Sequence, residues 1–217
     1  GAGRTELAKA IFGYDPIEGG KLFFQGREMD LTKFNCHRAV KEGIAMISED
    51  RKSEGLFLDM SIADNVAQAS LFQTFPRGMV QQKKIKQMAA EGVKTLRIAT
   101  TSVRKKVVNL SGGNQQKVVV AKWLQTGSKL FIFDEPTRGI DVGAKAEIYS
   151  IINDLAARGA AIMMISSDMM ELIGLSDRVY VMKDGEISGE VNHTESMFTQ
   201  EYLLSLGIEG GEGRETE

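Results

Sequence analysis

Two acidic residues, Asp134 and Glu135, follow an apolar run at residues 130–133. The run predicts a strand that carries both carboxylates to its C-terminal end, where open α/β sheets bind their ligands. One carboxylate of such a pair can hold a metal ion, and the next can orient a water molecule. Taken alone, the pair fits equally well a buried strand that ends in an exposed turn.

A second candidate for chemistry is formed by Ser111, Gly112 and Gly113, which precede an apolar run at residues 118–124. The run predicts a buried helix, and the two glycines allow the backbone to approach a charged group closely. A helix start offers free N–H groups and the positive end of its dipole to an anion. A capped helix alone explains the glycines equally well, but their place before two carboxylates favours an anion site that acts with them.

The first five residues, Gly1, Ala2, Gly3, Arg4 and Thr5, open a helical pattern that continues to residue 12. They fit the second half of a phosphate-binding loop, G-x-x-x-x-G-K-[ST], with Gly3 as its second glycine and Thr5 as its Mg²⁺-binding hydroxyl. Arg4 stands where the loop has lysine, and a planar guanidinium cannot simply replace a compact ammonium. The first glycine and its strand are missing, so we expect an N-terminally truncated loop, although a glycine-rich turn capped by Thr5 also fits.

The sequence LSGGNQQK at residues 110–117, followed by FIFDEPTRGID at residues 131–141, resembles the signature motif, Walker B motif and D-loop of ABC-transporter nucleotide-binding domains. The resemblance covers nearly the whole chain and is greatest to the second cassette of the tandem ATPase subunit of ribose-type monosaccharide importers. It implies an α/β fold of the P-loop NTPase, ABC ATPase type, with a mostly parallel sheet core and an inserted helical subdomain.

The resemblance also implies ATP and Mg²⁺ as cofactors and assigns roles to single residues. Glu135 is expected to be catalytic, together with Glu49 in the place of the Q-loop glutamine and Ser167 in the place of the switch histidine. Magnesium is expected at Thr5, Asp134 and Glu49. Contacts to nucleotide are expected from Gly1, Ala2, Gly3, Arg4, Thr5, Ser111, Gly112, Gly113, Gln115, Asp134 and Asp141. Because a serine cannot carry charge near neutral pH as a histidine can, we expect this half-site to be weak.

ABC cassettes work as head-to-tail pairs, so the resemblance implies that the intact signature at Ser111 completes the ATP site of a partner cassette. The expected partners are the first cassette of the same subunit, membrane permease subunits and, indirectly, an extracytoplasmic sugar-binding protein. The expected function is ATP hydrolysis that drives monosaccharide import at the cytoplasmic face of the membrane. The alternatives are a non-hydrolysing cassette that only completes the partner site, and an importer of nucleosides or another small solute.

The composition supports one domain with a sizeable core, because 42% of the 217 residues are hydrophobic and 26% are charged. The net charge of −2 and the dispersed basic residues argue against nucleic-acid binding, and so against an ABC ATPase of DNA repair or translation. Cys36 has no partner for an intrachain disulfide, which fits a reducing compartment. His37 and His193 lie far apart, so a zinc site is not expected. No apolar run is long enough to span a bilayer.

The remaining pattern predicts the elements that position these residues. We expect helices at residues 34–42, 141–158 and 201–206, strands at residues 44–47 and 161–165, and a hairpin formed by residues 179–182 and 186–191 with its turn at Asp184 and Gly185. The helix at 141–158 and the strand at 161–165 complete a β-α-β crossover, in which Met163 and Met164 are expected as core. One apolar helix face is expected from the spacing of Ile85, Met88, Ala89, Val93 and Leu96. We expect one nucleotide-binding domain at residues 1–209, with a helical subdomain at about 56–126, and a disordered tail at residues 210–217. Apolar residues between Phe57 and Met79 are expected to form subdomain core; alternatively, some of them line a groove for the coupling helix of a permease.

Overall fold

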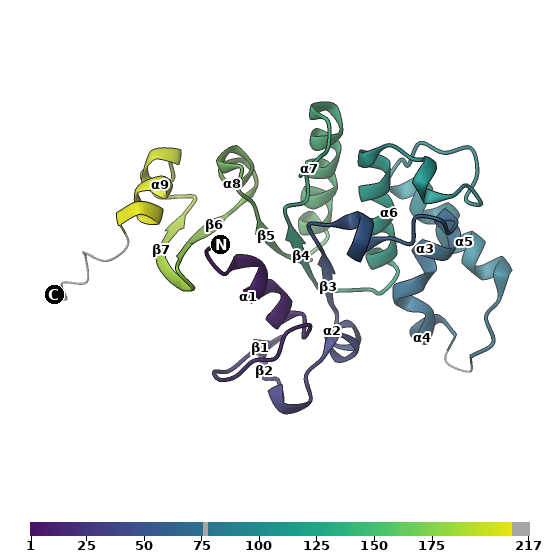
Figure 1. The fold of residues 1–217 in the computed structure, drawn as a ribbon, viewed down its shortest axis with the longest axis horizontal. Coiled ribbons are helices and arrows are strands. Elements are labelled where there is room, and N and C mark those ends of the chain that lie inside the picture. The colour runs from purple at the N-terminus through teal and green to yellow at the C-terminus, as the bar shows by residue number, and fades with distance from the viewer. Residues whose placement is uncertain (76–77, 210–217) are drawn as a thin grey trace.

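A three-stranded parallel sheet lies at the centre of the computed structural model, which describes residues 1–75 and 78–209 (Figure 1). Its order is β3 (Ile44–Ile47), β4 (Leu130–Asp134) and β5 (Ala161–Ile165). All four residues of β3 are buried, as expected for the continuous apolar run of a parallel strand. The helix α7 (Val142–Ala157) connects β4 to β5, which confirms the predicted β-α-β crossover.

The N-terminal region begins with α1 (Arg4–Ile11) and a short hairpin of β1 (Phe23–Phe24) and β2 (Arg27–Glu28). The next helix, α2 (Cys36–Glu42), starts two residues later than predicted. The reason is Asn35, whose side chain accepts a hydrogen bond from the N–H of Arg38 and caps the helix.

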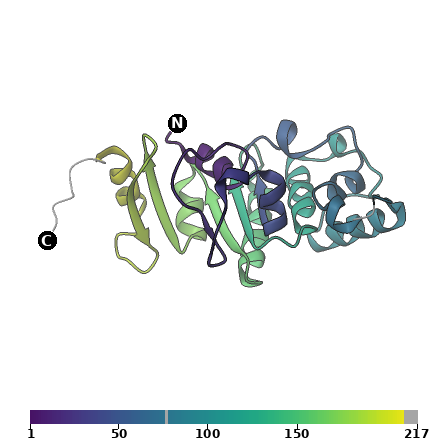
Figure 2. The same cartoon turned by 90° about the horizontal axis from the view of Figure 1, so that it is seen from below.

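Helices form one end of the molecule, next to β3 and β4 (Figures 1 and 2). They are α3 (Ile62–Ala67), α4 (Leu71–Thr74), α5 (Gln82–Thr95) and α6 (Gly112–Leu124). Ile85, Met88 and Ala89 of α5 are buried, which confirms the predicted apolar face of this helix. Among residues 1–75 and 78–209, no helix combines the length and the apolar character that crossing a bilayer requires.

The prediction that the apolar residues between Phe57 and Met79 form subdomain core is wrong for four of them. Phe57, Met60, Phe72 and Met79 are exposed, with Phe72 retaining 79% of its accessible surface. For Phe72 the reason is that α4 is only one turn long and has no buried residue, and the other three lie outside the helices. Phe75 is buried as predicted.

The opposite end of the molecule contains α8 (Met169–Leu175), the antiparallel pair β6 (Arg178–Lys183) and β7 (Glu186–Asn192), and α9 (Gln200–Glu209) (Figure 2). The predicted turn at Asp184 and Gly185 is confirmed. Both residues have positive φ, 50° and 86°, as a two-residue hairpin turn of type I′ requires. The predicted tail at residues 210–217 lies outside the described residues.

A groove separates the central sheet from this hairpin. Within the described ranges, β5 pairs only with β4, and β6 pairs only with β7, so one edge of each strand is free. The groove has a volume of about 790 Å³. Its lining includes the whole of β5, most of β6 and the side chains of Arg4 and Leu7 from α1. Met163 and Met164, expected as core, are only partly buried because they face this groove.

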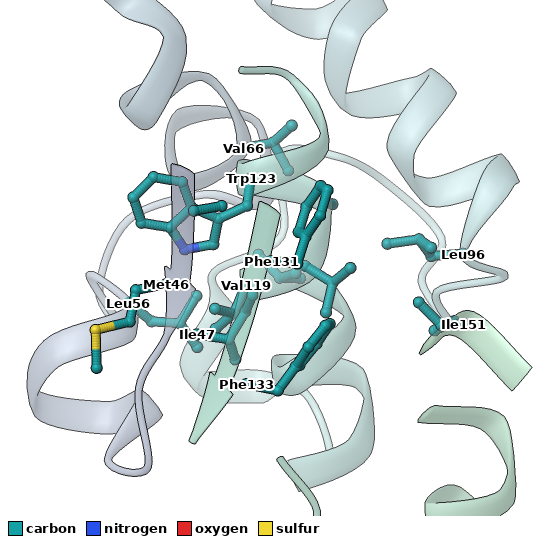
Figure 3. Packing of buried hydrophobic residues seen from close by; sticks show 14 of the residues in the cluster. Met46, Ile47, Leu56, Val66, Leu96, Val119, Trp123, Phe131, Phe133 and Ile151 are labelled. Carbon is teal, nitrogen blue, oxygen red and sulfur yellow. The ribbon is translucent and has the colours of Figure 1, made fainter. Parts of the chain in front are cut away.

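The core is densest where α6 crosses the sheet. Figure 3 shows Val119 and Trp123 of α6 beside the buried strand residues Ile47, Phe131 and Phe133. Each of these side chains is at least nine-tenths buried. Full burial of a side chain of this kind contributes about 1.5–3 kcal/mol, so α6 is fixed firmly on the sheet.

One charged residue, Lys122, lies inside this packing. Its ammonium group donates a hydrogen bond of 2.7 Å to the carbonyl oxygen of Gly55 and lies 5.1 Å from the ring centroid of Trp123. Burial lowers the pKa of Lys122 from 10.5 to about 8. Folding therefore requires a charged group to leave water at neutral pH.

We expect Lys122→Met to change how stability depends on pH. Below pH 8, Lys122 is protonated in both states, and the folded chain bears the cost of the buried charge. Between pH 8 and 10.5 the unfolded chain binds more protons, so the stability of the parent protein rises with pH. The free energy of unfolding of Lys122→Met relative to the parent should therefore fall by roughly 1–3 kcal/mol from pH 7 to 10.5.

Urea denaturation at several pH values measures this difference. The exposed lysine Lys129 provides the control, because Lys129→Met should show no change with pH relative to the parent. If the free energies of unfolding of Lys122→Met and the parent changed equally with pH, the cost assigned to burying Lys122 would be contradicted.

Candidate functional site

The two predicted carboxylates lie at the C-terminal end of β4, as the apolar run indicated. Asp134 is 1% exposed, and neither of its carboxylate oxygens accepts a hydrogen bond from a described residue. Burial raises the pKa of Asp134, and the nearby hydroxyl of Thr5 opposes this shift without satisfying the oxygens. A buried carboxylate without a partner is costly, so this group is suited to a ligand that supplies positive charge.

Glu135 is held in an unusual backbone conformation. Its φ is 47°, a left-handed value that is uncommon for residues other than glycine, and its N–H donates to the carbonyl oxygen of Ile165 at 2.9 Å. The hydroxyl of Ser167 donates to the Glu135 carboxylate at 3.2 Å. The structure thus brings Glu135 and Ser167 together. Backbone strain of this kind often accompanies a functional site.

The N-terminal loop and α1 bring their predicted residues to the same edge of the sheet. Gly3 has a φ of 88°, and an added Cβ there would lie 3.3 Å from the Cα of Gly185, so the loop needs glycine at this position. The carbonyl oxygen of Ala2 accepts a hydrogen bond from the N–H of Gly185. Arg4 donates to the carbonyl oxygen of Ser166 at 2.9 Å. Its guanidinium is therefore partly engaged with the protein.

Glu49 lies elsewhere in the site. Its carboxylate forms an ion pair with Arg138, and no hydrogen bond in the described chain joins it to Asp134 or Thr5. Two residues further on, the guanidinium of Arg51 donates to the carbonyl oxygens of Arg138 and Gly139. The segment after β3 is therefore tied to the segment after Glu135.

Sequence reasoning missed both contacts. Arg51 begins a five-residue π-helix, Arg51–Gly55, whose cap is Asp50. Hydrogen bonds from Lys52 and Ser53 lower the pKa of the Asp50 carboxyl. Single-turn π-helices are frequent at functional sites, but the charged run around Arg51 gives no periodic signal that predicts one.

Ser111 begins α6, as predicted. Its hydroxyl accepts a hydrogen bond from the side chain of Asn114 at 2.9 Å and caps the helix. Space restricts both glycines: a Cβ on Gly113 would lie 2.6 Å from the Cβ of Ala144, and one on Gly112 would lie 2.8 Å from the guanidinium of Arg51, which would have to move. Ser111 itself is exposed, so the helix start faces away from the body of the protein.

Two residues predicted to contact nucleotide have hydrogen-bond partners within the protein. Gln115 is 6% exposed, and its side-chain amide donates to the carbonyl oxygen of Val107. Asp141 caps α7 by accepting a hydrogen bond from the N–H of Ala144 at 2.9 Å. A residue four positions after a helix start points inward or outward according to its neighbours, which local sequence does not specify.

The site therefore consists of two separate groups. One contains the N-terminal loop, Thr5, Asp134, Glu135 and Ser167. The other is the exposed helix start at Ser111. Among the described residues, no hydrogen bond or ion pair joins Ser111 to either carboxylate. The first group can hold a cation beside an anion, and the second can close on an anion that another molecule presents.

The comparisons with known proteins agree with this chemistry. The model of the family described as "ABC transporter" matches residues 1–138. The "Ribose import ATP-binding protein RbsA" of Bacillus licheniformis is 47% identical over 210 residues, which cover 97% of this chain and 42% of the relative. The protein of the same name from Oceanobacillus iheyensis is 47% identical over 215 residues, covering 99% of this chain and 42% of the relative. The chain thus spans less than half the length of these curated relatives.

Solved structures share the fold. The ATP-binding cassette MJ0796, in a dimeric post-hydrolysis state bound to ADP and Pi, matches with a TM-score of 0.75 and 19% identity over 89% of this chain and 82% of that chain. The ADP conformation of the cassette MJ1267 matches with a TM-score of 0.75 and 19% identity over 95% and 84%. These likenesses confirm the predicted α/β fold of the P-loop, ABC ATPase type.

Proposed function

Because the chain belongs to the ABC transporter family, we propose that it is an ATP-binding and ATP-hydrolysing cassette that drives import of a ribose-like monosaccharide. The observation that carries this proposal is the buried, unpartnered Asp134 beside the Gly3–Thr5 helix start, with Glu135 next in the chain. The names of the relatives, which are ribose import ATP-binding proteins, supply the substrate class.

Magnesium fits the first group of residues. The orphaned oxygens of Asp134 and the hydroxyl of Thr5 are hard oxygen ligands, which this ion prefers. When bound with ATP, the ion neutralises charge on the phosphates. Glu49 can join this site only by leaving its ion pair with Arg138.

Other residues of this chain bind the phosphates and position the attacking water. The amides of Gly1, Ala2 and Gly3 face the phosphates from the start of α1, where the helix dipole favours negative charge. Glu135 orients the attacking water, and its carboxylate is held by Ser167. Arg4 and Ser167 replace the lysine and the histidine of the family pattern, so this half-site binds or turns over nucleotide slowly.

The signature at Ser111 serves a different nucleotide. In this proposal the chain is the second cassette of a tandem subunit, and a span of 42% of the relatives leaves room for a first cassette of similar length. We propose that the hydroxyl of Ser111 and the amides of Gly112 and Gly113 contact the γ-phosphate held by that partner, and the exposure of Ser111 at the helix start supports this. Donors that are fixed before the reaction stabilise the charge that develops in phosphoryl transfer.

The groove between β5 and β6 holds one further strand in the complete cassette. A parallel strand in this position pairs with the free edge of β5 and leads directly into the loop at Gly1. This is the strand–loop–helix arrangement of a P-loop. The support is that β5 and β6 each present one free edge to the groove among the described residues, and that Arg4 and Leu7 of α1 line the same groove.

Permease subunits contact the exposed apolar residues of the helical end. Phe57, Met60, Phe72 and Met79 are exposed apolar side chains, and such side chains mediate protein contacts where they gather. The subunit then lies at the cytoplasmic face of the membrane, and the permease receives sugar from an extracytoplasmic binding protein. A cassette that only completes the partner site is the alternative, as is an importer of nucleosides or another small solute.

Replacing Phe72 with glutamate should abolish assembly with the permease. A charge on a surface that is buried in the complex must lose its water, which costs several kcal/mol. Co-purification of the complete subunit with a tagged permease measures the loss. Tyr14→Glu is the control, because Tyr14 is also an exposed aromatic residue but lies in the turn after α1. Equal recovery of both variants with the permease would remove this surface from the proposal.

The experiment that tests the proposed function uses the complete subunit with its permease and binding protein in proteoliposomes. ATP hydrolysis should rise when ribose is added and should drive ribose uptake. Hydrolysis that responds to a nucleoside but not to ribose would favour the alternative substrate class. Absence of hydrolysis with intact assembly would contradict the proposal.

A further inference from the structure

A buried carboxylate that the proposed mechanism does not use, Glu171, lies behind the pair formed by Glu135 and Ser167. Glu171 is only 3% exposed and belongs to the first turn of α8. One carboxylate oxygen accepts hydrogen bonds from the hydroxyls of Thr137 and Tyr149, the latter at 2.7 Å. The other accepts a hydrogen bond from the hydroxyl of Ser166 at 2.7 Å. Both oxygens are thus satisfied inside the protein, as a buried charge requires.

These partners come from the segments that carry the site. Thr137 lies two residues after Glu135 and is itself 3% exposed. Ser166 directly precedes Ser167 and is 2% exposed. Glu171 therefore connects the loop after β4 with the loop after β5 through two buried hydroxyls. The hydrogen bond between Ser167 and Glu135 spans the same two loops on their exposed side.

The third connection runs to α7. Lys145 of this helix lies 3.6 Å from the Glu171 carboxylate and 3.2 Å from that of Asp168, and Tyr149 lies one turn further along. The ion pair with Lys145 lowers the pKa of Asp168, and burial, followed by the bond to Glu171, raises that of Tyr149. The start of α7 also packs against α6, the signature helix that begins after Ser111. The packing is close, since an added Cβ on Gly113 would lie 2.6 Å from the Cβ of Ala144.

We propose that Glu171 is a positioning residue that holds the loops of Glu135 and Ser167 in register and links them to the signature helix through α7. This inference rests on the proposed ATPase function. Glu171 contacts neither of the carboxylates at the end of β4 and does not itself act on nucleotide. Its effect on turnover passes through α7 to the signature helix that begins at Ser111, and misplacement of a catalytic group by about 1 Å can cost roughly 100-fold in rate.

The test compares Glu171→Leu, Glu171→Gln and the parent in the complete subunit assembled with its permease. Glu171→Leu removes every acceptor, so we expect the kcat for ATP to fall about tenfold while the KM changes little. Glu171→Gln keeps one acceptor oxygen for Thr137 and Tyr149, and the hydroxyl of Ser166 can turn to accept from its NH2 group, so most of the rate should return. Glu201→Leu is the control, because Glu201 also lies in the first turn of a helix but is exposed.

Amide hydrogen exchange without nucleotide provides a second readout that does not depend on ATPase activity. In Glu171→Leu, the amides of the loops after β4 and β5 should exchange faster together, while those of β3 remain protected. If both loops exchange as in the parent, or if Glu171→Leu and the parent have equal kcat values, the proposal is overturned. Faster exchange in a complex whose parent form hydrolyses no ATP would instead overturn the proposed function and leave the positioning role intact.

Two milder variants keep the inference falsifiable if Glu171→Leu does not fold. Thr137→Val and Ser166→Ala each remove one hydroxyl from the Glu171 carboxylate and retain the charge and its ion pair with Lys145. Each should lower kcat and loosen both loops. A loss of thermal stability without change in kcat or in coupled exchange would assign Glu171 to folding alone and overturn the proposal.

Discussion

Replacing Ser111 with arginine in the complete subunit should lower ATP turnover by about 100-fold or more, the usual cost of removing a fixed donor from developing charge. Ser111 caps α6 and is exposed, so the long side chain does not disturb the core. It does occupy the space in which the partner's nucleotide meets the helix start. Steady-state ATPase measurements on the assembled transporter determine the loss.

The comparison with Glu135→Gln distinguishes the two sites. In the proposed function Arg4 and Ser167 weaken this chain's own half-site, so Glu135→Gln should reduce turnover only slightly. Ser196→Arg supplies the matched control, since Ser196 is an exposed serine in the loop before α9. Should Ser111→Arg leave turnover intact while Glu135→Gln abolishes it, the two sites would have the opposite roles.

The second large effect concerns the groove between β5 and β6. An N-terminal extension that supplies a five-residue apolar strand, the length of β5, should raise the free energy of unfolding by roughly 3 kcal/mol. The reason is that the strand buries apolar side chains against Met163 and Met164 and satisfies the free edge of β5. For a chain of this size the unfolding temperature should rise by about 10 °C.

Differential scanning calorimetry measures this gain. The control is an extension of equal length with lysine at alternate positions, which cannot enter an apolar groove without burying charge. Amides of β5 should also become protected from exchange with the apolar extension alone. Equal effects of the two extensions, or no effect of either, would show that the groove does not hold a strand.

Local sequence was sufficient to predict features that depend on a single strand, helix or turn. The apolar run before Asp134 predicted a buried strand with a carboxylate at its end, and the glycine pair after Ser111 predicted the helix start. The turn at Asp184 and Gly185 was predicted from residue type, because few residues tolerate positive φ at two adjacent positions.

Local sequence was insufficient to predict contacts that depend on packing between distant segments. The side chain of Gln115 points inward and bonds to Val107, and Glu49 forms an ion pair with Arg138. The hydrophobic periodicity of a helix or strand predicts neither contact. In the sequence Glu171 resembles any acidic residue near the start of an apolar helix. The fold brings Thr137 and Ser166 to it from distant parts of the chain. The only signal in the sequence is that an acid interrupts an apolar run, which many exposed helices share.

Apolar composition was also misleading near α4. Phe72 and Met79 have the residue type of core and are exposed, because the segment forms one turn rather than a full helix. We propose above that these exposed apolar residues contact a partner. The surface of the molecule therefore adds information on function that hydrophobic periodicity does not contain.

Photolabelling tests most directly whether the signature of this chain serves the nucleotide of its partner. An ATP analogue with a photoreactive group on its γ-phosphate, bound to the complete subunit, should label the peptide that contains Ser111. The labelling should disappear when the P-loop lysine of the first cassette is replaced and persist when Thr5 of this chain is replaced by alanine. Labelling that is lost with Thr5→Ala and kept without the partner's lysine would contradict the account.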